Sequence, residues 1–293
     1  MDGLKSAAEF SRYTKKYGDP MIIDAHAHAC GDFLNGKDII KILNRNNVDK
    51  VVLVPGELGS DKNYSLPELA AKFPNSDIVA ITNLITKLVI GIAGVAKQIG
   101  EGNTYVYSLV KEYPDRIIQF YWVRLSQSNS LEDLEQHYTE YGFKGIKLHQ
   151  CWESFKINSD KFHKISEWAA SHDLPIFVHL FTKRQATQLA KYIKEHPNTI
   201  FIIGHLFGLE RYLETGINSD NTFFEISSPQ LVSIQRLMKA IQFFGAKRIL
   251  MGSDTPYGLK NLELNITRVK DLRITDGEKC LILGDNMKKL LRI

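Results

Sequence analysis

Residues 21–28 have the sequence MIIDAHAH, in which His26 and His28 are separated by one residue and follow an apolar run. In a strand, alternate side chains project to the same face, so the two imidazoles would lie about 7 Å apart. Two imidazoles on one side of a rigid element can hold one metal ion. The pattern also fits a half-buried strand whose histidines form local hydrogen bonds, so the motif alone leaves both interpretations open.

Polar residues also stand at the ends of other predicted strands. These residues are Lys147, His149, His179, His205 and Asp254. In a barrel of parallel strands, the C-terminal strand ends meet at one mouth, where active sites lie. Separate local roles would need a different cause at each position, whereas a metal centre accounts for all of them together. The convergence of titratable groups therefore favours metal binding.

The elements that would position these groups alternate between strand and helix. Apolar strands are predicted to start near residues 22, 50, 117, 143, 175, 200, 223 and 249, with helical patterns between them. Near-continuous apolar strands joined by helices indicate a parallel sheet buried on both faces, and eight such strands close an α/β fold of the (β/α)8 TIM barrel type. We expect one barrel domain over residues 21–293, preceded by an N-terminal extension, residues 1–20.

The stretch between the second and third strands is long for a single connection. A capping-box pattern, SLPE, predicts a helix over 65–73, and residues 78–81 are expected to form a short strand. Residues 84–113 have helical patterns in two pieces divided at 100–102. We interpret them as an excursion that covers a site or a partner surface, as in a homodimer. The alternative is that they are simply the helix that precedes the next strand.

Composition excludes several classes of protein. The 293-residue chain is 44% hydrophobic and 24% charged, with a formal net charge of +4, as in soluble globular proteins. No Lys/Arg cluster with interleaved aromatic residues indicates nucleic-acid binding, and the longest apolar run, residues 88–96, is too short to span a bilayer. Three widely spaced cysteines argue against a disulfide framework. Together with the polar N-terminus, they predict a cytoplasmic protein that acts on a small molecule.

Taken together, the strand-end motifs resemble those of the amidohydrolase superfamily. The likeness is to its amidohydrolase-2 branch of aminocarboxymuconate-semialdehyde decarboxylase-like metal-dependent hydrolases. The motifs are DAHAH (24–28), GIKLH (145–149), VH (178–179), GH (204–205), GSDTPY (252–257) and ILGDNM (282–287). The resemblance covers residue 21 to the end, although residues 84–113 are not anchored by it.

The resemblance implies a divalent metal, most often zinc, held by His26, His28 and His179. Asp254 would complete the site or hold the metal-bound water, and His205 would stand beside it as an acid, base or electrophile. Three protein ligands and an open position suit a catalytic ion, which lowers the pKa of its water to about 7. A carboxylate can then accept the proton of that water, and a second histidine can polarise the bond under attack.

Lys147 and His149 leave the number of metal ions open. In binuclear members of the superfamily, a carboxylated lysine at the end of the fourth strand bridges two ions, and Lys147 has a comparable place. His149 or His205 would then serve the second ion. In the alternative interpretation, an unmodified Lys147 pairs with a substrate acid or an internal carboxylate. We favour one ion, because the branch resembled here is mostly mononuclear.

Other residues near strand ends have weaker interpretations. Arg124 is predicted either to bind a substrate carboxylate or to form a surface ion pair. Tyr257 is predicted either to line the pocket or to pack under the last helix, and Asp24 either to orient a ligand or to make an ordinary strand-end hydrogen bond. Cys30 and Cys151 are not expected to be nucleophiles, since activated water already supplies the attacking group.

These patterns predict a zinc-type hydrolase that attacks an amide, lactone or ester bond of a small anionic substrate through metal-activated water. The first alternative is a non-oxidative decarboxylase of an aromatic or muconate-like acid, which would use the same site. A metal-dependent binding protein without activity is the alternative from another class, and it would bind a ligand without turnover.

Overall fold

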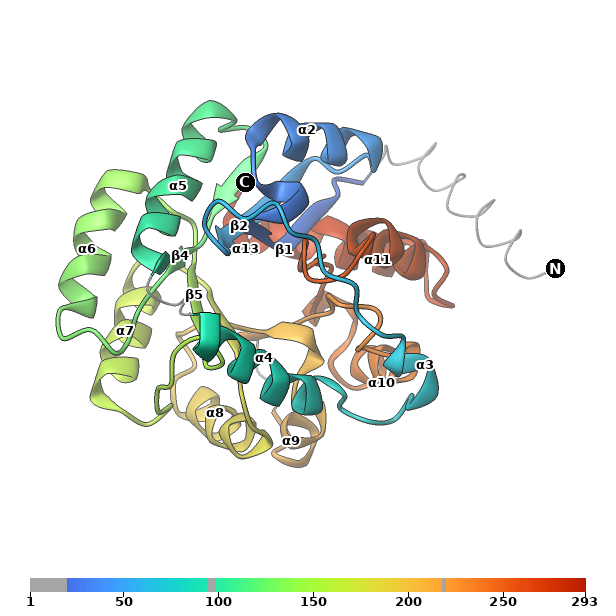
Figure 1. Cartoon of the computed structure of the whole chain (residues 1–293). Helices are drawn as coiled ribbons and strands as arrows, with labels where there is room; N and C mark the ends of the chain where they lie inside the picture. Colours follow the sequence, from blue (N-terminus) through green and yellow to red (C-terminus); the bar gives the residue numbers. More distant parts are fainter. Residues whose placement is uncertain (1–19, 94–97, 218–219) are drawn as a thin grey trace.

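Parallel strands and helices alternate along the chain in the computed structural model, which describes residues 20–93, 98–217 and 220–293 (Figure 1). The predicted extension, residues 1–20, lies outside the described residues apart from Pro20. The strands are β1 (Ile23–Ala29), β2 (Lys50–Pro55), β3 (Ile117–Gln119), β4 (Tyr121–Trp122), β5 (Ile146–His149), β6 (Ile176–His179), β7 (Phe201–Ile203), β8 (Thr222–Glu225) and β9 (Ile249–Leu250).

Two hydrogen-bonded ladders form the barrel wall, one of β1, β2 and β3 and one that runs in order from β4 to β9. β3 and β4 are two halves of the single strand predicted to start at residue 117. β3 pairs with β2, whereas the N–H of Tyr121 in β4 donates to the carbonyl of Gly145 beside β5 (2.9 Å). At the other seam, the N–H of Ala25 in β1 donates to the carbonyl of Met251 just after β9 (2.9 Å). The segments therefore occupy eight positions, and the predicted TIM-barrel architecture is confirmed.

An outer ring of helices covers the strands (Figure 1). It consists of α2 (Gly36–Arg45), α5 (Ile99–Glu112), α6 (Ser130–Tyr141), α7 (Asp160–Ser171), α8 (Lys183–Glu195), α9 (Leu209–Glu214), α10 (Ile234–Phe244) and α11 (Asn261–Lys270). Each helix turns an apolar face inward; in α2 this face includes Ile39 and Leu43, both fully buried. This packed layer fixes the strands, so side chains at the strand ends have rigid relative positions.

The stretch between β2 and β3 differs most from the sequence-based expectation. The expected strand at 78–81 is instead the beginning of α4 (Val79–Ala93), and the expected helix at 65–73 shortens to α3 (Leu69–Lys72). A four-residue apolar run such as IVAI does not distinguish a strand from the start of a buried helix. α4 crosses the open end of the barrel, whereas α5 joins the outer ring (Figure 1).

The glycine-containing segment 100–102 does not divide the helical region as predicted, because it lies in the first turns of α5. A Cβ atom on Gly102 would lie 2.8 Å from the Cβ of Pro55. The glycine therefore marks a close approach of α5 to β2 rather than a helix end. The connection between α4 and α5, residues 94–97, lies outside the described residues.

The C-terminal helices pack against the start of β1, and this contact gives a stability prediction. α12 (Asp276–Cys280) continues through a π-helical turn (Leu281–Asp285) into α13 (Asn286–Leu291). A methyl group on Gly284 would overlap the carbonyl oxygen of Met21, whereas Gly277 has nothing within 4 Å of its Cβ position. We expect Gly284→Ala to lower the free energy of unfolding by about 2 kcal/mol, because backbone must move to admit the methyl group.

Thermal denaturation of the two alanine variants tests this expectation. Gly277→Ala is the matched control and should leave the Tm unchanged or slightly raised, since alanine favours the helix. Equal Tm values for the wild type and Gly284→Ala would contradict the tight contact with β1.

Candidate active site

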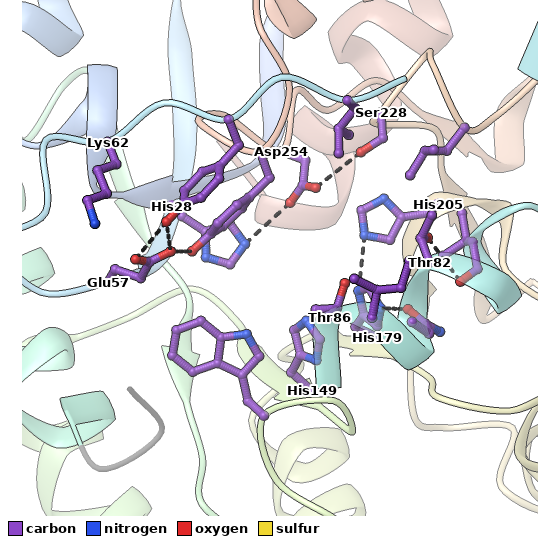
Figure 2. Close-up of a pocket in the computed structure, with 18 residues that line it drawn as sticks. His28, Glu57, Lys62, Thr82, Thr86, His149, His179, His205, Ser228 and Asp254 are labelled. Atoms are coloured by element: carbon purple, nitrogen blue, oxygen red, sulfur yellow. Dashed lines mark hydrogen bonds and ion pairs between the residues drawn. The ribbon is translucent and has the colours of Figure 1, made fainter. Parts of the chain in front are cut away.

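A cavity of about 410 Å³ opens at the C-terminal ends of the strands (Figure 2). His28, His149, His179, His205 and Asp254 line it, and α4 supplies part of its wall. These residues come from β1, β5 and β6 and from the segments that follow β7 and β9. The structure thus brings residues that are far apart in the sequence to one cavity, as the strand-end rule predicts.

His26, His28 and Asp254 form a buried group whose possible ligand atoms all lie within 4.8 Å of one another. The two imidazole centroids are 5.0 Å apart, and His28 Nε2 lies 3.4 Å from Asp254 Oδ1. His28 Nδ1 lies 2.7 Å from the carbonyl of Pro55, to which it donates, so its Nε2 keeps a free lone pair. His26 Nδ1 is buried, has no hydrogen-bond partner among the described residues and lies 3.7 Å from Asp254 Oδ1. An orphaned imidazole nitrogen beside a carboxylate and a free lone pair fits a divalent cation.

Asp24 holds the backbone of this group together. Its Oδ1 accepts hydrogen bonds from the N–H of Ser253 (2.8 Å) and of His26 (3.2 Å). The N–H of Asp254 in turn donates to the carbonyl of His26 (2.7 Å). Burial raises the pKa of Asp24 to about 7. Asp24 therefore positions the segments that carry the metal-ligand candidates, and its contacts are with backbone rather than with an imidazole.

The charge states of the group suit metal binding. Burial, and then the nearby Lys147, hold the pKa of His26 well below its usual range, so this ring is neutral, the form that coordinates metals. Burial alone would raise the pKa of Asp254, but His205 and His28 lower it below its usual value. Asp254 is thus ionised at neutral pH. It also has a left-handed backbone (φ +59°), a strained conformation that structures keep where a side chain must be aimed.

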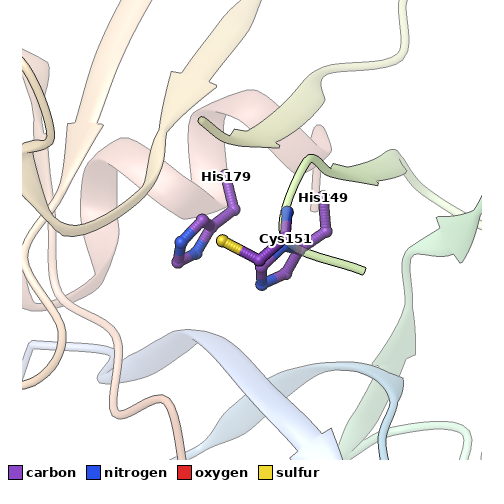
Figure 3. A group of neighbouring side chains, drawn as sticks. All are labelled: His149, Cys151 and His179. Atoms are coloured by element: carbon purple, nitrogen blue, oxygen red, sulfur yellow. The ribbon is translucent and has the colours of Figure 1, made fainter. Parts of the chain in front are cut away.

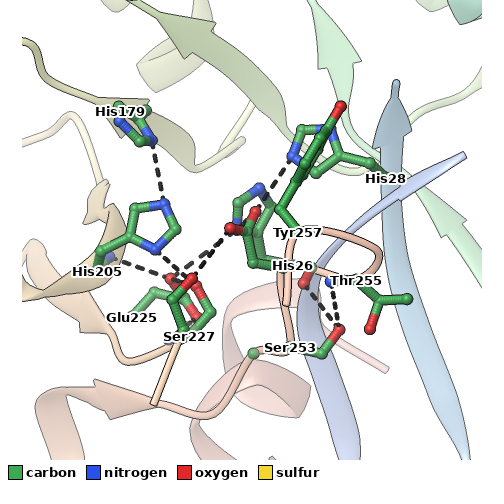
Figure 4. Close-up of polar contacts among 12 residues, drawn as sticks. His26, His28, His179, His205, Glu225, Ser227, Ser253, Thr255 and Tyr257 are labelled. Carbon is green, nitrogen blue, oxygen red and sulfur yellow. Dashed lines mark hydrogen bonds and ion pairs between the residues drawn. The ribbon is translucent and has the colours of Figure 1, made fainter. Parts of the chain in front are cut away.

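His179 and His205 form a second set of contacts in the same cavity (Figure 4). His205 Nε2 lies 3.0 Å from His179 Nδ1, and His179 Nε2 lies 2.8 Å from Oδ1 of Asn83 on α4. Asn83 also donates to the carbonyl of Leu180 (2.8 Å). Both ring nitrogens of His179 are therefore engaged, and the ring of His205 lies in turn 5.7 Å from that of His26.

A hydrogen-bond chain continues from His205 to a buried acid. His205 Nδ1 lies 2.8 Å from Ser227 Oγ, which donates to Glu225 Oε2 (2.8 Å). Burial raises the pKa of Glu225 to about 8. Burial also lowers the pKa of His205 to about 4, although Asp254 opposes this shift. His205 is thus neutral at pH 7, and its two ring nitrogens are held by hydrogen bonds to His179 and Ser227.

Lys147 is fully buried beneath the cavity. Its Nζ lies 2.8 Å from His26 Nε2 and 4.0 Å from the ring centroid of Phe177. Burial lowers its pKa to about 7. The structure therefore places this amine against a metal-ligand candidate. The internal carboxylates of Asp254 and Glu225 oppose the lowering of its pKa, although no hydrogen bond or ion pair joins Lys147 to either of them among the described residues.

His149, Cys151 and His179 form another group with ligand atoms within 4.8 Å of one another (Figure 3). The rings of His149 and His179 are stacked, with centroids 3.8 Å apart and planes at 9°. Burial raises the thiol pKa of Cys151 to about 12, and also that of Cys30 to about 12. Neither thiol is therefore a thiolate at neutral pH, which agrees with the expectation that neither is a nucleophile.

The side of the cavity beyond His28 is lined by tyrosines and an acid. Tyr257 packs its ring 5.0 Å from that of His28, and its hydroxyl lies 3.4 Å from Glu57 Oε1. The hydroxyl of Tyr64 donates to the same carboxylate (2.7 Å). Lys62 is exposed at this end of the cavity (Figure 2). Tyr257 thus lines the pocket, the first of its two predicted roles.

Arg124 is not brought to the cavity. Its Nε lies 3.7 Å from Glu153 Oε2, and neither residue is part of the cavity lining. Of its two predicted roles, the ion pair is the one that the contacts show. The helix and turn histidines at 137, 163, 172 and 196 are also outside the lining.

Several residues of the site were not singled out from the sequence. Glu225 ends β8 and Glu57 follows β2 by two residues, so both carried the same signal as the predicted histidines: a polar residue at the end of an apolar strand. Asn83 and Lys62 carried no such signal, because their places depend on the paths of α4 and of the loop before it.

No helix within the described ranges combines the length and apolar character that a membrane span requires.

Comparison with known proteins points to one family and fold. A family model described as amidohydrolase matches residues 23–293. A probable 2-pyrone-4,6-dicarboxylic acid hydrolase from Acinetobacter baumannii, with citric acid bound, has a TM-score of 0.67 at 16% identity, covering 93% of this chain and 99% of that chain. The structure of 2,6-dihydroxybenzoate decarboxylase from Rhizobium has a TM-score of 0.66 at 14% identity and covers 94% of this chain and 99% of that chain. A dihydroxybenzoic acid decarboxylase from a Polaromonas species, with bound manganese and an inhibitor, has a TM-score of 0.65 at 13% identity. The match covers 94% of this chain and 97% of that chain. At these identities the structural likeness shows the fold alone. No curated protein matches the chain.

Proposed function

This chain belongs to the amidohydrolase family, and from that premise we propose that it is a metal-dependent hydrolase of an amide, lactone or ester bond in a small substrate. His26, His28 and Asp254 would hold one divalent cation, with His179 as a further ligand once one of its nitrogens is released. Zinc suits two or three imidazoles and a carboxylate. When bound, the ion supplies an acidic water and polarises the carbonyl under attack.

The observation that carries the proposal is the position of the buried Asp254 carboxylate, whose Oδ1 lies 3.4 Å from His28 Nε2. An ionised carboxylate at this place accepts a proton from the attacking water and later gives it to the leaving group. His205, neutral at pH 7, keeps His179 oriented through its hydrogen bond. Ser228 donates to the other Asp254 oxygen (3.1 Å), which leaves Oδ1 to face the reacting atoms.

The lining of the cavity favours hydrolysis over decarboxylation of an aromatic or muconate-like acid. A decarboxylase must fix the carboxylate that it removes, for which arginine is the usual residue. Among the described residues that line the cavity there is no arginine, and Lys62 is the one lysine. We therefore propose a substrate with no more than one acidic group, which would lie toward Lys62.

The two reactions can be separated directly. The zinc-loaded protein is incubated with a panel of small lactones, amides, esters and aromatic acids, and released acid and carbon dioxide are followed together. Acid release without carbon dioxide supports the hydrolase. Carbon dioxide release with no acid release would replace it by the decarboxylase. Elemental analysis of protein purified without chelator gives the metal, and we expect about one ion per chain.

Lys62 gives a prediction about the substrate. On the hydrolysed member of the panel, Lys62→Met is expected to raise KM about fivefold with little change in kcat, because an exposed charge pair contributes about 1 kcal/mol to binding. Lys72→Met, at the end of α3 and outside the cavity, is the control. An unchanged KM for Lys62→Met would show that the acidic group does not lie at this end.

A further inference from the structure

We propose that His149 is a fixed hydrogen-bond donor that presents its Nε2–H to a substrate oxygen in the cavity. The identity of that oxygen rests on the proposed function, whereas the state of the ring follows from contacts within the chain.

The proton of His149 is placed by a backbone contact. The N–H of Cys151 donates to His149 Nδ1 (3.1 Å), so Nδ1 carries a lone pair and the ring hydrogen must be on Nε2. Other described histidines show the opposite arrangement. His28 and His196 each place Nδ1 against a backbone carbonyl oxygen, at 2.7 and 2.8 Å, and donate from it. Among the described histidines, His149 alone has an Nδ1 that accepts from a backbone amide.

Two aromatic neighbours fix the direction in which Nε2 points. The ring of His149 lies between those of Trp122 and His179. Its centroid is 5.5 Å from that of Trp122, with the ring planes at 6°, and 3.8 Å from that of His179, with the planes at 9°. Only 6% of His149 is exposed, yet it lines the cavity (Figure 2). No described residue makes a hydrogen bond to its Nε2. A donor that is held rigid and left unpaired at a cavity surface is available to a ligand.

The same contacts argue against a second metal ion on this group. An imidazole binds a metal through a lone pair in the plane of its ring. Because the planes of His149 and His179 are nearly parallel and stacked, their lone pairs do not converge on one point. His149 is therefore a donor to substrate rather than a ligand.

A hydrogen bond from such a donor becomes stronger when the acceptor atom gains negative charge during the reaction. In the attack of water on an amide, lactone or ester, the carbonyl oxygen becomes negative while the C–O or C–N bond to the leaving group is still intact. A neutral, preorganised N–H stabilises this oxygen without being titrated. We assign to His149 the binding of that oxygen.

The tautomer is tested by NMR on the zinc-loaded full chain, labelled with 15N at histidine. Long-range 1H–15N spectra should show an unprotonated Nδ1 and a protonated Nε2 for His149, with the signals assigned by their loss in His149→Phe. His28 and His196 should show the reverse pattern and serve as internal references. A proton on Nδ1 of His149 would overturn the inference, whatever reaction the protein catalyses.

The donor role is tested with benzohydroxamate, a zinc-binding probe that carries a carbonyl oxygen. His149→Phe should weaken its binding about tenfold, as expected for the loss of one hydrogen bond to a partly charged oxygen. His149→Gln, which keeps an N–H donor, should recover part of the affinity. The control is His196→Phe, which removes an equally stacked ring outside the cavity.

On the hydrolysed substrate, His149→Phe should lower kcat about 10²-fold with a smaller change in KM, since the bond strengthens in the transition state. Equal affinity of the wild type and His149→Phe for benzohydroxamate would overturn the donor role. Failure of the wild type to bind the probe counts instead against the metal centre, and so against the proposed function. The tautomer result is independent of that outcome.

Discussion

Asp254→Asn is expected to lower kcat about 10³-fold on the hydrolysed substrate, which is the usual effect of losing a positioned acid–base group. The amide keeps an oxygen near His28 and the size of the side chain, but it cannot accept a proton. Since the pKa of Asp254 lies below its usual value, the wild-type side chain is a carboxylate at neutral pH, so the loss falls on proton transfer rather than on substrate binding, and KM should change little.

The matched control for this variant is Asp271→Asn. Asp271 is an exposed C-cap residue of α11 and does not line the cavity. Both variants should retain the wild-type Tm within a few degrees, and their metal content is measured in parallel. An Asp254→Asn protein with wild-type kcat and full metal content would remove this carboxylate from the proposed chemistry.

Loss of the metal is expected to abolish hydrolysis and to lower the Tm together, because an ion that binds only the folded chain stabilises it by mass action. His28→Ala should produce the same state by mutation. It removes the Nε2 lone pair that the hydrogen bond to Pro55 keeps free, and the purified variant should contain less than about one tenth of the wild-type metal.

His163→Ala is the control for the metal measurement, since His163 lies half-exposed on α7, away from the cavity. Adding zinc back should restore the chelator-treated wild type but not His28→Ala. If chelated protein that contains no detectable metal hydrolyses at the full rate, the proposed metal-dependent mechanism is wrong.

The barrel could be predicted because its signals are periodic and local. Buried parallel strands are continuous apolar runs, and polar residues that end them stand out, which is how His26, His28, His149, His179 and Asp254 were found. The predicted resemblance to the amidohydrolase family is confirmed by the match over residues 23–293. The split of one strand into β3 and β4 was not predictable, because it reflects a change of hydrogen-bonding neighbour rather than a change in the residues.

The remainder of the site depends on long-range packing. The wall that α4 provides could not be predicted, because its apolar start fits a strand as well as a helix. Arg124 has a side chain suited to binding a carboxylate, but it lies outside the cavity, next to Glu153. For His179, the sequence gives the strand and the side of the barrel. It does not give the contacts of the ring nitrogens, which depend on Asn83 and His205.

Asn83 joins helix α4, which forms part of the cavity wall, to His179 in the same cavity. The amide of this side chain donates a hydrogen bond to the carbonyl of Leu180 and accepts one from the ring of His179. A tilt of α4 that widened the entrance would break the second bond and leave the proton on His179 Nε2 without an acceptor, because Asn83 Oδ1 can only accept a hydrogen bond. The width of the entrance and the position of the proton on His179 would then depend on the same amide side chain.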